Sequence, residues 1–288
     1  RNVALVPQSG GELTNLSEGD FRSAIDVIFP ILHGPFGEDG TVQGLLKLAG
    51  VPFVGAGVLG SAIGMDKDVS KRLLRDAGLP IARFTVLKAG DDIDFDTICA
   101  DVNLPFFVKP ANLGSSVGVH KVSDKVGFGH AITDAFQFDT KIIAEEFVDG
   151  RELECSVLGN RDPIASVVGE IVSNHEFYSY EAKYIDEQGA ALEVPANLPA
   201  ETSDRLRALS IKAFEALSCE GMARVDFFLK TDGTVLINEI NTIPGFTKIS
   251  MYPRLWDASG LSYKDLIDRL IGLAIERFER EQKLKNSY

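Results

Sequence analysis

Cysteine is scarce in this sequence. Among 288 residues only Cys99, Cys155 and Cys219 occur, and no two of them form a C-x-x-C pair. An odd number of widely spaced cysteines argues against a disulfide framework and favours reduced, mostly buried thiols in a reducing compartment, so we expect a cytoplasmic protein. No histidine motif partners a cysteine, and we find no convincing Ser/His/Asp set, which argues against a protein nucleophile.

Basic charge and long apolar runs are also lacking. Lys and Arg total 29 against 42 Asp and Glu, a formal net charge of −13, whereas nucleic-acid binding needs a basic surface. No apolar run approaches the roughly 20 residues that span a bilayer, and Ile25–Leu32 has only the length of a strand. We therefore expect neither nucleic acid nor a membrane as partner, and a few local cations must hold any anionic ligand.

The chain is long enough for two or three modules, at about 100–200 residues per domain. The first segment has an α/β pattern, in which Ile25–Leu32 suits a buried parallel strand and the polar Pro7–Gly19 suits a surface loop. Helices are expected at Thr41–Ala49 and Lys67–Ala77. Two α+β regions follow, with strands at Phe84–Leu87, Phe106–Lys109, Val117–Val122, Ile142–Phe147, Glu152–Leu158, Ile164–Ile171, Ala223–Leu229 and Val235–Ile240, and helices at Phe95–Val102, Val126–Phe138, Ala200–Leu217 and Tyr263–Lys285.

The strongest chemical pattern lies on the pair of strands at 223–240. Side chains two residues apart on a strand share a face, so Arg224 lies beside Asp226, and Glu239 beside Asn241. If Thr231–Gly233 closes a hairpin, three oxygen ligands converge near an arginine, as suits Mg²⁺ that carries phosphates. The alternative is a solvated sheet face with salt bridges, but the apolar residues at the alternate positions argue against it.

A second pattern is the strand that ends in Lys109, followed by the loop Gly114–Ser116. Backbone amides of such a loop can face phosphate oxygens, and a lysine adds a point charge, although a plain hairpin turn is the alternative. A third, weaker pattern places acidic residues from Glu145 to Glu152 at a strand end, where a carboxylate can accept a sugar hydroxyl.

Together with Lys71, these patterns resemble the ATP-grasp superfamily. Within it, three segments resemble D-alanine–D-alanine ligases: His33–Gly40 (HGPFGEDG), Tyr178–Tyr184 (YSYEAKY) and Asn241–Thr247 (NTIPGFT). The resemblance implies a three-module ATP-grasp fold of α/β and α+β type. An N-terminal α/β substrate domain would cover residues 1–60, a small central α+β subdomain 61–147, and a C-terminal α+β catalytic subdomain with the metal site 148–288.

One departure concerns the beginning of the sequence. The family opens with a glycine-rich strand and a loop whose glutamate orients the amino group of the first D-alanine. This sequence begins at Arg1, and Pro7–Gly19 resembles a later, variable part. We therefore expect the opening element to be missing or removed and the N-terminal domain to be incomplete.

The resemblance also implies roles for single residues. Lys71 and Lys109 would hold the ATP phosphates, and Arg224 would stabilise charge on the reacting carboxyl. Lys183, in the segment Ser173–Ala190 that we expect to close over the nucleotide, would contact the transferred phosphoryl group. Further nucleotide contacts would be Ser116, Glu145, Glu146, Phe147, Val148, Glu152, Tyr178, Phe228, Asn238 and Glu239; His33, Glu38, Ser115 and Tyr184 would surround the first D-alanine; Gly245, Ser250 and Met251 would bind the second; and Asp226, Glu239 and Asn241 would ligate two Mg²⁺, with Mn²⁺ as an alternative metal.

The implied reaction consumes ATP to phosphorylate the carboxylate of one D-alanine, which the amine of a second D-alanine then attacks, for peptidoglycan precursor synthesis. We also expect a homodimer. Two alternatives stay open: a related ligase with D-lactate or D-serine as acceptor, and a nucleotide-binding module without turnover. The first is disfavoured because depsipeptide-forming relatives often carry a histidine where this chain has Glu181–Tyr184, and His175 lies too early. Purely structural roles are also open for His33 (a loop histidine), Lys71 (a solvated helix face), and Tyr178 with Tyr180 (a packed pair).

Overall fold

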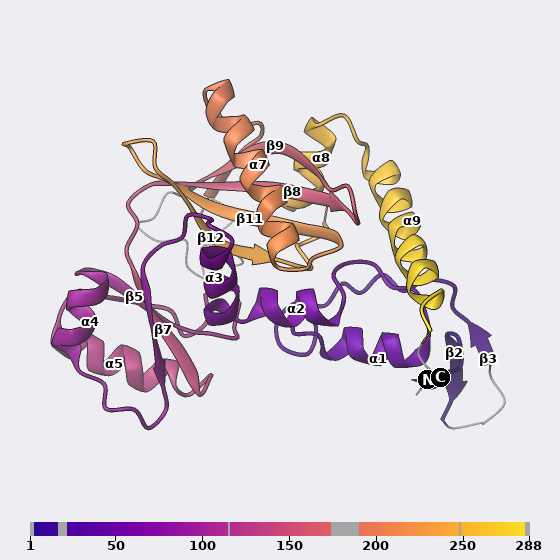
Figure 1. The fold of residues 1–288 in the computed structure, drawn as a ribbon, viewed down its shortest axis with the longest axis horizontal. Helices are drawn as coiled ribbons and strands as arrows, with labels where there is room; N and C mark the ends of the chain where they lie inside the picture. Colours follow the sequence, from indigo (N-terminus) through magenta and orange to yellow (C-terminus); the bar gives the residue numbers. More distant parts are fainter. Residues whose placement is uncertain (1–2, 17–21, 115, 174–189, 248, 286–288) are drawn as a thin grey trace.

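A computed structural model of the chain describes residues 3–16, 22–114, 116–173, 190–247 and 249–285. Across these ranges the strands form three sheets, of three, five and four strands. Figure 1 shows the five-stranded sheet above, the four-stranded sheet at the lower left and the three-stranded sheet at the lower right. Helices pack between and over the sheets, so each sheet has an apolar core of its own.

The N-terminal part differs from its prediction in two places. The expected loop 7–19 contains a strand, β2 (Glu12–Asn15), which pairs antiparallel with β1 (Val3–Leu5) and β3 (Arg22–Ala24) after a turn at two glycines with positive φ. The expected buried strand 25–32 forms only one parallel bridge, Ile28 to Phe53, and its last two residues are exposed. Pro30 cannot donate a ladder hydrogen bond, which explains why the pairing stops there.

The four-stranded sheet has the order β4-β7-β5-β6, with every neighbouring pair antiparallel. Phe106 and Val108 of β5 are buried among the residues of two helices, whereas Phe107 and Lys109 point to the opposite face, which is left for the pocket described below. The expected small antiparallel module is confirmed. Its elements are β4 (Phe84–Lys88), α4 (Phe95–Val102), β5 (Phe106–Pro110), β6 (His120–Val122), α5 (Lys125–Ala135) and β7 (Lys141–Glu146).

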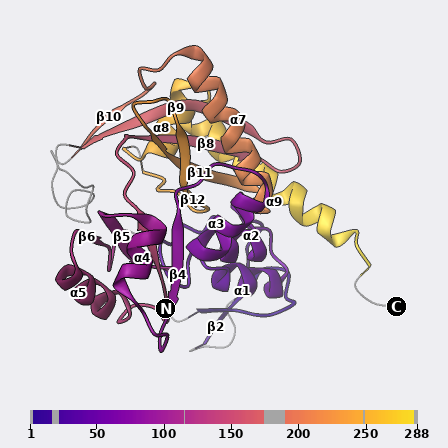
Figure 2. The same ribbon diagram turned by 60° about the vertical axis from the view of Figure 1, so that its left-hand side comes forward.

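The five-stranded sheet is antiparallel throughout, in the order β10-β9-β8-β11-β12. Helix α7 packs on one face, while α8 and α9 pack on the other, where Leu158 and Met222 belong to their core cluster. Figure 2 shows these helices around the sheet. The elements are β8 (Arg151–Gly159), β9 (Ile164–Ser173), β10 (Ala190–Glu193), α7 (Ala200–Ala216), β11 (Gly221–Leu229), β12 (Val235–Asn241), α8 (Met251–Ala258) and α9 (Tyr263–Gln282).

Helix α3 (Lys67–Asp76) connects the two larger sheets, as Figures 1 and 2 show. Asp66 caps its N-terminus by accepting a 3.1 Å hydrogen bond from the amide of Val69, and Lys141 of β7 lies 2.6 Å from the same carboxylate. Leu74, two residues before the other end, is buried in the core of the five-stranded sheet. The helix is therefore fixed to both sheets, and the preceding helix α2 (Val58–Met65) leads into it from the N-terminal part.

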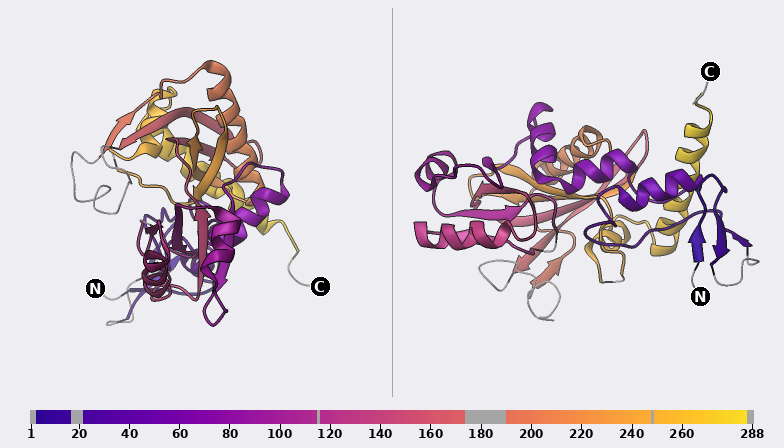
Figure 3. Two further views of the ribbon diagram at one scale, coloured as in Figure 1. Left: turned by 90° about the vertical axis from the view of Figure 1, so that its left-hand side faces the viewer. Right: turned by 90° about the horizontal axis from the view of Figure 1, so that it is seen from below.

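The remaining helix of the N-terminal part, α1 (Thr41–Ala49), lies near the end of α9, which Figure 3 shows beside the three-stranded sheet. Arg277 of α9 is 4% exposed and donates hydrogen bonds to the carbonyls of Gly55 and, at 2.8 Å, of Phe53. Its guanidinium also lies 4.4 Å from the centre of the Phe53 ring. The last helix thus fixes the backbone at 53–55.

The cysteines match their expected environment. Cys155 and Cys219 are buried and Cys99 is partly buried, and all three are free thiols. Burial raises the pKa of Cys219 to about 12, which keeps this thiol protonated and unreactive at neutral pH. Among the helices that the structure describes, none has both the length and the apolar character to cross a membrane.

Candidate active site

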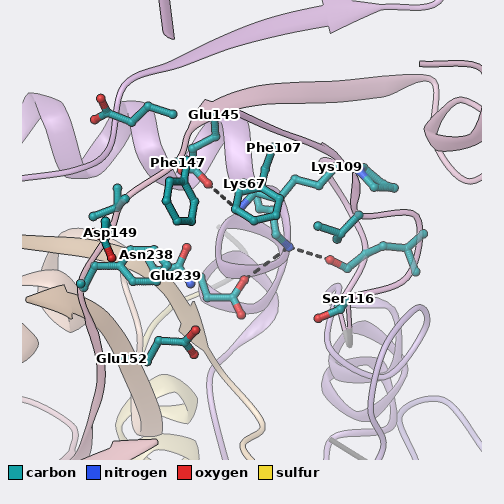
Figure 4. A pocket seen from close by; sticks show the side chains of 18 residues that line it. Lys67, Phe107, Lys109, Ser116, Glu145, Phe147, Asp149, Glu152, Asn238 and Glu239 are labelled. Carbon is teal, nitrogen blue, oxygen red and sulfur yellow. Dashed lines mark hydrogen bonds and ion pairs between the residues drawn. The ribbon is translucent and has the colours of Figure 1, made fainter. Parts of the chain in front are cut away.

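A pocket of about 210 Å³ lies between the four-stranded and five-stranded sheets. The strand β5, the end of β7 and the residues that join it to β8 form one side, and β11 and β12 form the other. Figure 4 shows the side chains that converge on it. Ten of the residues proposed from the sequence line it: Lys109, Ser116, Glu145, Glu146, Phe147, Val148, Glu152, Phe228, Asn238 and Glu239.

Two lysines and a glutamate form a buried charge cluster beside this pocket. The carboxylate of Glu145 pairs with Lys71 and, at 2.5 Å, with Lys109. Burial lowers the pKa of Lys71, whereas the charges of Glu145 and Glu239 outweigh burial and raise the pKa of Lys109. One carboxylate thus pairs with two ammonium groups. The cluster of these three side chains therefore keeps a net positive charge, which suits phosphate.

The position of Lys71 rules out the alternative that it is a lysine on a solvated helix face. Its side chain is 1% exposed, so it is not a solvated surface lysine. Its ammonium also donates a 3.2 Å hydrogen bond to the carbonyl of Asn238, which fixes it against β12. Glu145, expected near adenine and ribose, is likewise held by the two lysines through its side chain, while the pocket lining also includes Glu146 at the end of β7 and the residues just after it.

Lys67 belongs to the pocket and was missed in the sequence. Its ammonium lies 3.5 Å from Glu239 and donates a 2.6 Å hydrogen bond to the carbonyl of Leu113, as the dashed lines of Figure 4 show. A signal was available, because Lys67 stands four residues before Lys71 and therefore on the same face of the helix. Three lysines, from α3 and β5, thus reach one region.

The predicted convergence of oxygen ligands is present: Asp226, Glu239 and Asn241 lie together, and we call these three residues the oxygen-ligand row. The hairpin closes at Thr231–Gly233, so that Asp226 lies directly opposite Glu239 and Arg224 opposite Asn241. The side-chain Nδ2 of Asn241 donates a 2.9 Å hydrogen bond to Asp226. A bulge in β12 puts both Asn238 and Glu239 against the pocket, although successive residues of a regular strand face opposite sides.

Arg224 is held by carboxylates on the same face of the sheet. It donates from Nε and Nη2 to the two oxygens of Asp226, each at 2.7 Å, and its Nε lies 3.0 Å from Glu154 of β8. Burial acts to lower the pKa of Arg224, but the charges of Asp226, Glu154 and Glu239 outweigh it and raise this pKa. The guanidinium is therefore a permanent and largely buried cation, with 19% of its side chain exposed. Glu154 is a second residue that the sequence reasoning missed.

The donor set at this row fits Mg²⁺. Two carboxylates and an amide share the sheet face beside the pocket, and Mg²⁺ is commonly held by one or two carboxylates while phosphates and water complete its octahedron. Within the described ranges no group of three or more His, Cys, Asp or Glu side chains is arranged to hold a metal ion without such help. Asp226, Glu239 and Asn241 would therefore hold the ion together with a phosphate-bearing ligand.

The His33–Gly40 segment reaches the same neighbourhood. The amide of Gly34 donates a 2.5 Å hydrogen bond to Glu38, which fixes the loop. Burial raises the pKa of Glu38, while the charges of His33 and Arg224 act to lower it and that of Glu239 to raise it. Glu38 thus lies within electrostatic range of Arg224 and Glu239.

The residues proposed for the second substrate, Gly245, Ser250 and Met251, follow strand β12 in the chain. Ser250 Oγ accepts a 3.0 Å hydrogen bond from the amide of Thr247 and lies 2.8 Å from its hydroxyl, and a Cβ at Gly245 would meet Ser250 at 3.0 Å. Met251 is buried with its sulfur against Gly169, so only its backbone could face a ligand. Four other proposed residues lie outside the described part of the chain: Ser115, Tyr178, Lys183 and Tyr184.

Comparisons with known proteins show which family the chain resembles. Models of the D-ala D-ala ligase N-terminus and C-terminus match residues 4–56 and 73–272. The chain is 58% identical to a D-alanine–D-alanine ligase of Oceanobacillus iheyensis over 290 residues, which cover 99% of the chain and 79% of the relative. At this identity and coverage the relationship extends over all three sheets.

Solved structures have the same fold. The D-alanine–D-alanine ligase of Coxiella burnetii superposes with a TM-score of 0.88 at 38% identity, over 98% of this chain and 76% of that one. The VanG D-Ala:D-Ser ligase of Enterococcus faecalis gives 0.86 at 37% identity, over 94% and 79%. A Bacillus anthracis D-alanine–D-alanine ligase complexed with ATP gives 0.78 at 33%, over 89% and 81%. The chain therefore belongs to the D-alanine–D-alanine ligase family and has the ATP-grasp fold.

Proposed function

We propose that the pocket between the two larger sheets binds ATP and that the row Asp226, Glu239 and Asn241 holds its metal ions. The chain is an ATP-dependent ligase that joins two D-alanines for peptidoglycan precursor synthesis. The observation that carries the assignment of sites is that the ammonium groups of Lys109 and Lys71 share Glu145 at the pocket, while Glu239 of the oxygen-ligand row lines the same pocket. Phosphates in the pocket would meet these lysines and the metal ions that the row would hold.

The chemistry follows from these charges. Two Mg²⁺, or Mn²⁺ in their place, would supply charge neutralisation at the phosphates. Lys71, Lys109 and Lys67 orient the nucleotide, and phosphoryl transfer depends mainly on such positioning. Arg224 faces the reacting carboxyl and stabilises the charge that develops when the amine of the second D-alanine attacks the D-alanyl phosphate. Ser115, Tyr184, Glu38 and His33 surround the first D-alanine, Lys183 contacts the transferred phosphoryl group, and Gly245, Ser250 and Met251 bind the second D-alanine.

Lys109→Met tests the phosphate assignment. The variant loses a charged hydrogen-bond donor, an interaction of about 1.5–3 kcal/mol, so KM for ATP is expected to rise about 10- to 100-fold. Steady-state kinetics with saturating D-alanine measures it. Lys125→Met, at an exposed lysine of the same sheet module that lies 3.8 Å from Asp96, serves as the control and should leave KM unchanged. An unchanged KM in both variants would remove Lys109 from the nucleotide site.

The acceptor is tested by ADP release with D-alanine, D-lactate and D-serine in turn, with product identification. D-Alanine arrives as an ammonium and D-lactate offers a less basic hydroxyl, so we expect dipeptide from D-alanine and little or no depsipeptide at neutral pH. The D-serine alternative has a specific motive, because one neighbour of similar fold is a D-Ala:D-Ser ligase. Depsipeptide as the main product with both acceptors present at pH 7 would replace our assignment by the D-lactate ligase.

We further propose that the enzyme is a homodimer and acts in the cytoplasm, where its substrate ATP is available. Light scattering after size-exclusion chromatography measures the mass directly. A mass of about 31 kDa, that of one chain, would show a monomer instead.

A further inference from the structure

Glu154 is a buried carboxylate next to the oxygen-ligand row. It is 4% exposed and lies on β8 directly opposite Asp226 of β11, which in turn lies opposite Glu239 of β12. Three carboxylates therefore stand side by side on three neighbouring strands, with Arg224 between two of them. Burying a third carboxylate here costs free energy unless the carboxylate pairs with a cation.

Asp226 is both the hydrogen-bond acceptor of Arg224 and a proposed metal ligand. Arg224 occupies both of its oxygens at 2.7 Å, and Asn241 donates to one of them at 2.9 Å. An ionised carboxylate offers about four acceptor positions, so at least three are engaged in this arrangement. A metal ion at Asp226 competes with Arg224 for the same two oxygens, and a largely buried guanidinium that loses its partner is strongly unfavourable.

We propose that Glu154 is a positioning residue that retains Arg224 when Asp226 is taken up by metal. Its oxygen already lies 3.0 Å from Arg224 Nε, so the guanidinium needs only a small rotation to exchange one carboxylate for the other. The exchange keeps the cation paired and in place beside the reacting carboxyl, and it frees oxygens of Asp226 for the metal. This inference rests on the proposed metal role of Asp226 and Glu239.

Glu154→Gln tests the proposal by metal binding rather than by turnover alone. Without the charge of Glu154, Arg224 has less to replace its two hydrogen bonds to Asp226, so it competes with the metal more strongly. We expect Mn²⁺, titrated in the presence of ADP and followed by the electron paramagnetic resonance of free Mn²⁺, to bind about 10-fold more weakly, the lower limit for loss of an outer-shell partner. The Mg²⁺ concentration for half-maximal activity should rise equally, while KM for ATP at saturating Mg²⁺ stays the same.

The matched control is Glu170→Gln. Glu170 is also buried and paired through two hydrogen bonds with an arginine, Arg151, but it lies opposite Leu153, on the α7 side of the sheet. Its loss should leave Mn²⁺ affinity unchanged. Equal weakening of Mn²⁺ binding in both variants, or wild-type affinity in Glu154→Gln, would overturn the proposal.

Two further variants keep the outcome interpretable. If Glu154→Gln does not fold, Glu154→Asp withdraws the carboxylate by one methylene, and we expect an affinity below that of the wild type; an equal affinity overturns the proposal. Glu239→Gln reports on the metal site itself. If that variant binds Mn²⁺ as the wild type does, the proposed metal site fails, which is a result distinct from the failure of the Glu154 role.

Discussion

Replacing Arg224 by methionine is expected to lower kcat about 100- to 1000-fold, the range seen when one preorganised donor to a developing negative charge is removed. Stability should fall as well, because Asp226 and Glu154 would lose the cation they share. Breaking a buried pair by removal of one partner costs about 3–5 kcal/mol. Steady-state kinetics and urea unfolding measure the two effects separately.

Arg151→Met is the control for this variant. Arg151 pairs with Glu170 on the α7 side of the same sheet, so its removal also leaves a carboxylate without its arginine but does not touch the oxygen-ligand row. We expect lower stability with kcat near that of the wild type. If kcat falls no further in Arg224→Met than in Arg151→Met, Arg224 has only a structural role.

Glu239→Gln should be nearly inactive while it remains folded. Loss of an outer-shell partner already costs about 10- to 100-fold, so loss of a direct ligand should lower kcat at least about 100-fold. The fold should tolerate the change, because the side chain is partly exposed and its ion pair with Lys67 spans 3.5 Å, a kind of contact that contributes about 0–1 kcal/mol. Turnover at saturating Mg²⁺ and the melting temperature are the measurements.

Asp232→Asn, at the tip of the same hairpin, is the matched variant. Asp232 accepts a hydrogen bond from the amide of Thr234 and lies outside the pocket, so activity should stay at the wild-type level. Near-normal activity of Glu239→Gln with an unchanged melting temperature would disprove its metal role.

The sequence predicted much of the oxygen-ligand row from strand geometry. Side chains two residues apart share a face, and a short turn places adjacent strands side by side, which brings Arg224 and Asp226 near Glu239 and Asn241. The bulge that puts Asp226 directly opposite Glu239, in place of Asn238, could not be predicted in this way. The same local reasoning predicted the antiparallel sheet around Lys109 and the helix α7. These features depend on contacts between segments close in sequence.

The sequence predicted less where the decisive contacts are distant. Glu145 and Lys71 lie on different elements, and only the packing of α3 against β7 shows that they neutralise each other. Glu154 also could not be recognised in the sequence, since its role depends on its contact with Arg224, seventy positions later. The apolar run at 25–32 looked like a core strand by composition, but nothing in its periodicity shows that Ile31 and Leu32 end up exposed.

The contact of Arg277 with residues 53–55 bears on the order in which the newly made chain can fold. Arg277 and Gly55 are separated by 222 residues, so their hydrogen bond cannot form until residue 277 has left the ribosome. The four-stranded sheet, complete by residue 146, can assemble well before that. During synthesis at about 5–20 residues per second, the backbone at 53–55 therefore waits roughly ten seconds or longer for its partner. A chaperone that binds the nascent chain would find this stretch accessible throughout that interval.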